Sequence, residues 1–205
     1  MANHVDWYMS RTKFKGAMNI FYLIDDAVLC ATAHGNRHVI KMILETCQLL
    51  CSVYHMTTPD VDVPYKLTHK NHPCAVWARK SLDNYRWLFQ LGVSLCCEYT
   101  HRYGKTHASE AVLAYLTTIE EPNIPSLGFT HPPQAMPEVY HGTSSIEAYR
   151  LYYKQEKRHL FAWKRRDMPT YLKFPFLDDI RKRLNVEDEM EYAVETVAMA
   201  KKRKR

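Results

Sequence analysis

Long apolar runs are missing from this 205-residue sequence. No window approaches 18 uninterrupted apolar residues, which is about the length that a membrane-spanning helix needs. The first 17 residues also lack the continuous apolar core of a signal peptide. These absences argue against an integral membrane helix and a secretory leader, so we expect an intracellular protein with no membrane partner.

Paired cysteine motifs are missing as well, because the six cysteines form no CxxC pair. Most of them occupy apolar positions of helical patterns, which is typical of reduced thiols in an intracellular protein. No zinc signature is present, and we predict neither a metal nor a cofactor. The cysteines are Cys30, Cys47, Cys51, Cys74, Cys96 and Cys97.

A strong net charge is missing from the body of the chain. The formal charge is +6, but the terminal "KKRKR" supplies five of those positive charges. The basic composition alone therefore says little about nucleic acid. The tail is typical of a solvated segment, with nuclear import or nonspecific DNA tethering as alternatives in a eukaryotic host. The chain is rich in His (11) and Tyr (14), residues suited to stacking and hydrogen bonding.

Glycine is scarce, at 6 residues, and helical periodicity dominates the pattern. Residues 18–23, "MNIFYL", predict a short strand or extended segment, and Asn36 is the predicted cap of a long helix. Ser144 opens a capping box for a later helix. Helices are expected over about 26–33, 36–54, from Pro73, 82–104, 107–118 and 144–163, with one or two amphipathic helices in the last 30 residues and long loops at 56–70 and 120–142.

These patterns predict a mainly α protein with a single compact helical domain, a short N-terminal strand or extended segment, and long ordered loops. We divide the chain into an N-terminal extension (1–17), a helical core domain (18–172) and a C-terminal helical segment with a basic tail (173–205). The sequence leaves the oligomeric state open.

The stretch "HGNRHVIKMILE" places four ionisable residues on one sector of a helix, namely His34, His38, Lys41 and Glu45. As a candidate catalytic cluster, it has a carboxylate that can stabilise an oxocarbenium ion or activate water. The alternative is a solvated helix edge on which Lys41 and Glu45 form an ordinary i,i+4 pair. His34 and His38 also have the spacing of zinc-binding helices, but no third ligand is visible, so we predict no metal.

Basic and aromatic residues gather in three further stretches, "NHPCAVWARKS", "RYGKTH" and "YRLYYKQEKRHLFAWKRR". Cations interleaved with aromatic rings are suited to holding phosphates and stacking bases. The alternative is that the aromatics belong to the core and that the cations complement helix termini or line an ordinary surface helix. The candidate nucleic-acid-binding residues are Asn71, His72, Trp77, Arg79, Arg102, Tyr103, Lys105, His107, Lys157, Trp163 and Lys164.

The order of the motifs resembles that of a widespread set of phage and large-DNA-virus proteins over about residues 18–172. That resemblance implies a viral or phage protein inside an infected host cell, and carries no activity with it. The motifs that carry it are "MNIFYLID", "HGNRHVIKMILE", "NHPCAVWARKSLDNYRWL", "EYTHRYGKTH", "AMPEVY", "YRLYY" and "WKRRDMP".

More remotely, the chain resembles the pyrimidine-dimer DNA glycosylase family of the endonuclease V type. The stretch "RHVIKMILE" parallels that family's early helix, and "RRDMPTYLKF" parallels its aromatic tail. The resemblance implies that Glu45 takes the place of the catalytic glutamate and His38 that of a nearby histidine. It implies an enzyme that acts on DNA at a damaged or modified base, in repair or modification, as an N-glycosylase with or without lyase activity.

Two other functions stay open at this point: a noncatalytic module that binds DNA or a viral protein, and an enzyme that acts on a nucleotide. The family attacks the sugar with the amine of its processed N-terminus, whereas 17 residues precede Met18 here. Either the true start is Met18, or these residues fold away, or the chemistry does not use an N-terminal amine.

Overall fold

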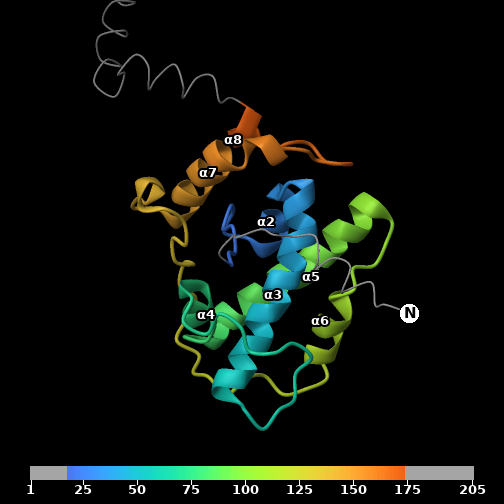
Figure 1. Cartoon of the computed structure of the whole chain (residues 1–205), viewed down its shortest axis with the longest axis vertical. Coiled ribbons are helices and arrows are strands. Elements are labelled where there is room, and N and C mark those ends of the chain that lie inside the picture. The colour runs from blue at the N-terminus through green and yellow to red at the C-terminus, as the bar shows by residue number, and fades with distance from the viewer. Residues whose placement is uncertain (1–17, 174–205) are drawn as a thin grey trace, which may run out of the picture.

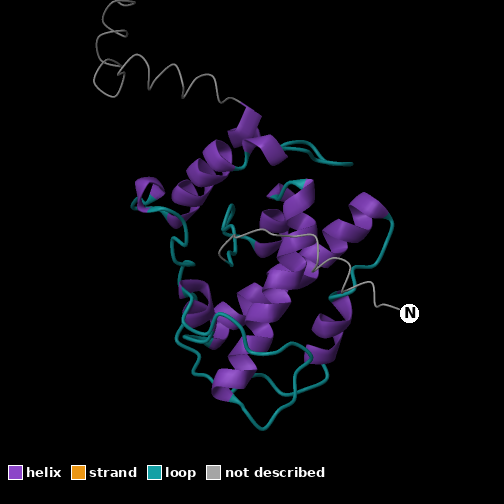
Figure 2. Cartoon of the chain, viewed as in Figure 1, coloured by secondary structure: helices purple, strands orange, loops and turns teal. Residues whose placement is uncertain are grey.

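A computed structural model describes residues 18–173, and every regular element within that range is helical (Figures 1 and 2). The predicted mainly α fold is therefore confirmed. The N-terminal extension, the predicted helices of the last 30 residues and the basic tail lie outside the described residues. The elements are α2 (Ala27–Ala33), α3 (Asn36–Thr57), α4 (Pro73–Ala78), α5 (Leu82–Tyr103), α6 (Glu110–Leu116), η1 (Glu138–Tyr140), α7 (Ser145–Glu156), η2 (Arg158–Leu160) and α8 (Thr170–Lys173).

The two long helices, α3 and α5, pack against each other at the centre of the domain (Figure 1). Each has 22 residues. Local signals mark both ends of α5: the Ser81 side chain caps its start, and Gly104, at a φ of 65°, ends it. Gly92 allows a close approach, because a Cβ at this position would lie 3.0 Å from Thr46 Cγ2 and 3.2 Å from Leu113 Cδ2. The centre of the core therefore depends on a residue without a side chain.

The N-terminal segment 18–23 is buried beside this helix pair and makes no strand in the described range. Asn19 Oδ1 accepts hydrogen bonds from the amides of Ile20 and Phe21, which removes donors that a strand ladder would need. Phe21 has a φ of 50°, so the backbone is not extended throughout. The strand alternative is wrong for these residues, and the segment is irregular.

Two predicted helix boundaries are also wrong. Gly35, and not Asn36, is the N-cap of α3, because Asn36 is already helical and its Oδ1 accepts from Arg102 Nη1 and the amide of Lys164. The helix expected over 144–163 ends at Glu156. The chain beyond it turns back onto α2 and α3, where Ala162 O accepts from the Asn36 amide. Tertiary hydrogen bonds thus override the local helical pattern.

The loop 120–142 crosses from α6 to α7 without an α-helix or strand, as its prolines predict. It is fixed by hydrogen bonds to the helices that it crosses: Thr130 N donates to Asn84 Oδ1, and Trp77 Nε1 donates to Thr130 O. Nδ2 of Asn19 donates to Ala135 O, which ties the loop to the N-terminal segment. None of the helices between residues 18 and 173 is long and apolar enough to cross a bilayer.

Candidate active site

Glu45 lies at the meeting of α3 and the N-terminal segment, and its side chain is 10% exposed. Oε1 lies 2.6 Å from Lys41 Nζ, one helical turn earlier. Oε2 accepts a hydrogen bond of 3.1 Å from the backbone amide of Asn19. The carboxylate therefore has one charged partner and one backbone donor, and it keeps a small opening to solvent.

His38 is 5% exposed and lies between Phe21 and Tyr153. Its ring centroid is 4.7 Å from that of Phe21, and its Nδ1 is 2.7 Å from the hydroxyl of Tyr153. Burial is the main cause that lowers the pKa of His38 to about 3. His34, when it is protonated, and the charge of Lys157 lower this pKa further. The imidazole is therefore neutral at physiological pH.

His34 is fully buried and lies outside α3, at the C-cap of α2. Its Nδ1 lies 2.7 Å from Cys30 O, and burial lowers its pKa to about 4. The expected row of four ionisable groups on one helix edge is therefore corrected. His38, Lys41 and Glu45 share α3, whereas His34 packs in the core as a neutral side chain.

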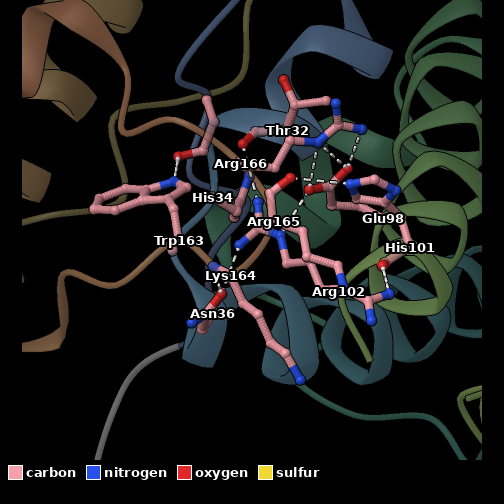
Figure 3. Close-up of polar contacts among 12 residues, drawn as sticks. Thr32, His34, Asn36, Glu98, His101, Arg102, Trp163, Lys164, Arg165 and Arg166 are labelled. Carbon is pink, nitrogen blue, oxygen red and sulfur yellow. Dashed lines mark hydrogen bonds and ion pairs between the residues drawn. The ribbon is translucent and has the colours of Figure 1, made fainter. Parts of the chain in front are cut away.

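A second charged cluster joins the ends of α2, α3 and α5 (Figure 3). Arg102 is 0% exposed, and it donates to Glu98 Oε1, to Asn36 Oδ1 and to Thr32 O. Arg166, from the segment after α7, donates to both oxygens of Glu98. We refer to these five residues, Thr32, Asn36, Glu98, Arg102 and Arg166, as the arginine clamp.

The arginine clamp corrects the prediction that Arg102 contacts a phosphate. Its guanidinium is buried and its donors are directed at partners within the protein, so none of it is presented to a ligand. Trp77 is corrected in the same way, because it is 5% exposed and its Nε1 is bonded to Thr130 O. Both side chains stabilise the fold, which is the alternative that the sequence left open.

The remaining candidates divide among three places. Lys157 lies near the Glu45 site, with Nζ 4.9 Å above the ring of Tyr152, which stacks on Phe21. Beside the arginine clamp lie Tyr103, whose ring lies under Lys164, and Trp163, whose Nε1 donates to Ala33 O. Near other helix termini lie Asn71 (exposed), His72 (the N-cap of α4), Arg79 (bonded to Lys70 O), Lys105 (exposed) and His107 (half-buried against Tyr99).

Sequence reasoning missed two residues of the Glu45 site, Asn19 and Tyr153. Asn19 stands in a stretch that is notable only for its β formers, and Tyr153 is one of several tyrosines in "YRLYY". Both act over long distances in sequence, 26 residues for Asn19 and Glu45 and 115 for Tyr153 and His38. No local spacing signals such pairs.

A third polar group lies at the surface, where the hydroxyl of Tyr22 is bonded to Asp25 and to His131 Nδ1. The side chains of Asp25 and His131 are about two thirds exposed, and the ring of Tyr22 contacts Trp87. No local spacing in the sequence signals this group, because the path of the loop 120–142 brings His131 to Tyr22. Within residues 18–173, no three His, Cys, Asp or Glu side chains are arranged to hold a metal ion.

Comparison with known proteins places this geometry in context. No match was found among curated proteins or among solved structures. A family model described as pyrimidine dimer DNA glycosylase matches residues 18–111, which include the N-terminal segment, Glu45, His38 and the whole of α5. Over that segment the chain resembles the pyrimidine-dimer DNA glycosylase family, and its likeness to a DNA glycosylase holds at that level.

Proposed function

We propose that this protein is a DNA N-glycosylase that acts at a damaged or modified base, with Glu45 as its central carboxylate. One observation carries the proposal. Within the part of the chain that matches the glycosylase family, the N-terminal segment 18–23 contacts α3, because Asn19 N donates to Glu45 Oε2 at 3.1 Å. A nearly buried carboxylate is thereby held at a fixed position beside the backbone of residues 18–23.

The chemistry suits a carboxylate in this environment. When an N-glycosidic bond breaks, positive charge develops on the sugar, and a fixed negative charge next to it lowers the barrier. Burial strengthens that interaction, because water screens it less. Lys41, at 2.6 Å, balances the charge of Glu45 before the substrate binds.

The nucleophile in this proposal is water. With Met18 attached, the nitrogen of Asn19 belongs to a peptide bond and its N–H donates to Glu45, so it has no free lone pair for attack on the sugar. Water would form the new bond to the sugar carbon, lose a proton to Glu45 and release the base with the electron pair of the glycosidic bond. The departing base takes up a proton from solvent, and Glu45 returns the proton that it accepted to solvent.

The test uses the full chain and a DNA duplex with one cyclobutane pyrimidine dimer. Base release is measured as the alkali-labile abasic site that glycosidic cleavage leaves, because the cleaved pyrimidine stays joined to its neighbour through the cyclobutane ring. We expect Glu45→Gln to lower turnover by about 10²–10³-fold while binding to DNA is retained. Glu121→Gln is the matched control, because Glu121 is an exposed carboxylate that pairs only with Arg86 among the contacts described. Equal turnover by Glu45→Gln would remove this carboxylate from the chemistry.

Borohydride reduction separates the two chemical routes. We expect no trapped adduct of the full chain through residue 1, since the proposed reaction has no imine. A chain that begins at Asn19 provides the contrast, because its amine would occupy the position of the amide that faces Glu45. If that shorter chain is trapped and only it releases the base, the hydrolytic route is wrong and Glu45 keeps its place beside an amine nucleophile.

A noncatalytic DNA-binding protein is the second candidate, favoured by cations held over aromatic rings. Lys157 Nζ lies 4.9 Å from the Tyr152 centroid, and Lys164 Nζ lies 5.5 Å from that of Tyr103. Such pairs are suited to phosphates and stacked bases without any reaction. Tight binding of the dimer-containing duplex, with no base release by the unaltered chain, would support this candidate over the glycosylase.

A further inference from the structure

Tyr153 of α7 connects the loop before α3 to the Glu45 site. Its side chain is fully buried, and its hydroxyl accepts a hydrogen bond of 2.8 Å from the amide of Gly35. The same hydroxyl lies 2.7 Å from Nδ1 of His38. The approach is close, because a Cβ at Gly35 would lie 3.3 Å from this oxygen.

These contacts determine where the protons lie. An amide can only donate, so Gly35 occupies one acceptor site of the hydroxyl. Among the described residues, the Tyr153 hydroxyl has no partner other than Gly35 and His38. Its own proton therefore points to His38 Nδ1, which must accept. An imidazole that accepts at Nδ1 is neutral and carries its hydrogen on Nε2.

The surroundings of His38 favour the same protonation state. The ring is buried, and the titratable groups around it contribute positive charge when they are protonated, which opposes a charged imidazole. The groups are His34, just before α3, Lys41 on α3, Lys157 at the end of α7 and His159 in η2. The N-terminal segment packs Phe21 against the ring, and this side chain adds no charge.

Nε2 is the free end of this imidazole. Within residues 18–173, none of the protein groups accepts from it, although the residue is 5% exposed. On α3, His38 lies on the same face as Lys41 and Glu45, whose spacing of three and seven residues returns to one side of the helix. Among the described residues this donor has no acceptor, and it lies on the same helix face as the proposed carboxylate.

We propose that Tyr153 is a positioning residue that fixes His38 as an uncharged donor, whose Nε2–H binds an oxygen of the DNA sugar-phosphate backbone beside Glu45. The identity of the bound oxygen rests on the proposed function, whereas the fixed tautomer does not. His38 then contributes no proton to the reaction, which differs from the acid/base cluster that the sequence suggests. His38 orients the substrate, and Tyr153 orients His38.

The tautomer is tested by nitrogen NMR of the full chain labelled with ¹⁵N-histidine, with the His38 signals assigned by their loss in His38→Gln. We expect the Nε2–H pattern, unchanged from pH 5.5 to 8. In Tyr153→Phe, Nδ1 loses its donor, so the second tautomer should appear and the ring should titrate at higher pH. Tyr149→Phe is the matched control, since this buried hydroxyl on the same helix binds Pro133 O and not His38.

An Nδ1–H pattern in the unaltered chain, or a His38 that titrates between pH 5.5 and 8, would overturn the proposal even if Tyr153→Phe fails to fold. So would a Tyr153→Phe variant with unchanged His38 signals.

Base release then tests the contact with DNA. Gln carries an uncharged donor near the position of Nε2, so His38→Gln should stay within about tenfold of the unaltered chain, while His38→Ala loses about a hundredfold. If both fall equally, His38 acts as an acid or base and the proposed contact is wrong. If the unaltered chain releases no base at all, the proposed function and this contact fail together, whereas the NMR result still decides the role of Tyr153.

Discussion

Lys41 with Glu45 and Glu98 with Arg102 are both i,i+4 ion pairs on 22-residue helices, and in both pairs the closest nitrogen–oxygen distance is 2.6 Å. Their environments differ. The side chains of the first pair are 35% and 10% exposed, whereas those of Glu98 and Arg102 are 2% and 0% exposed. The same spacing therefore produces a partly exposed ion pair in one place and a buried structural ion pair in the other.

The two carboxylates, Glu45 and Glu98, also differ in how many hydrogen bonds they can still accept. An ionised carboxylate has about four acceptor positions. The acceptor positions of Glu98 are occupied by hydrogen bonds from Arg102 and from two nitrogens of Arg166, so no position is left for a ligand. Glu45 is bonded to Lys41 and to the Asn19 amide, which leaves capacity for a substrate or water. Unused capacity next to solvent distinguishes the candidate site from the arginine clamp.

The largest expected effect is on stability. Arg102→Met leaves Glu98 buried with Arg166 alone and removes the bonds to Asn36 and Thr32, so the free energy of unfolding should fall by about 3–5 kcal/mol. Lys41→Met breaks the pair that is partly exposed, and the expected loss is below about 1 kcal/mol. Urea denaturation of both variants measures the difference.

Equal losses in the two variants would mean that burial does not separate the pairs. A variant Arg86→Met serves as the control, because it breaks the most exposed Arg–Glu pair described, with side chains about half exposed. Its expected effect is close to zero.

A smaller effect is expected on the free energy of unfolding at acid pH, through the titration of Glu98. Burial alone would raise the pKa of Glu98, but hydrogen bonds from Arg166 and Arg102 outweigh it and hold this pKa below its ordinary value. A lowered pKa in the folded state adds stability above the unfolded pKa of about 4.3, and that stability is lost as the pH falls through the folded value. Unfolding free energies measured from pH 7 down to about pH 2 should therefore fall less steeply in Glu98→Gln. An unchanged slope would mean that Glu98 is not the group that titrates.

The sequence predicts the local parts of this structure well. The long helix over 82–104 was expected from neighbouring residues, and the structure confirms it, with Ser81 as its cap and Gly104 at its end. The spacing of Lys41 and Glu45 also predicts their contact, because one helical turn brings them together. Such features depend on backbone geometry that a few adjacent residues determine.

The predictions that were wrong concern features that depend on segments distant in the sequence. Arg102 was a candidate phosphate ligand because cations and aromatic residues gather in "RYGKTH". It is buried because the segment around Arg166, 64 residues later, covers it. α7 ends at Glu156 because the same segment turns toward Asn36, whose Oδ1 accepts from the amide of Lys164. Whether a charged side chain is sealed or open is decided by which remote segment packs on it, and helical periodicity contains no such information.

The smallest expected effect is on the affinity for DNA. Its salt dependence distinguishes binding at the Glu45 site from binding at the arginine clamp. If Lys157, Lys105 and Lys164 contact phosphates, each neutralisation to Ala should lower the slope of log K against log salt by about 0.9, because one fewer counterion is released. Between 50 and 200 mM salt that amounts to roughly a threefold to fourfold change in relative affinity. Lys105 and Lys164 are exposed residues, and Lys157 is half-buried.

Arg102→Met should leave this slope unchanged, in conditions where the variant is folded, because the buried guanidinium reaches no phosphate. Equilibrium binding to a dimer-containing duplex at four salt concentrations measures all four slopes. Lys157 is the most informative of the three lysines, because it lies on the ring that stacks against Phe21, next to His38 and the Glu45 site. A slope that falls for Lys164→Ala and not for Lys157→Ala would place the DNA along the arginine clamp and away from Glu45. That outcome would favour the noncatalytic candidate, since the open carboxylate would then face no substrate.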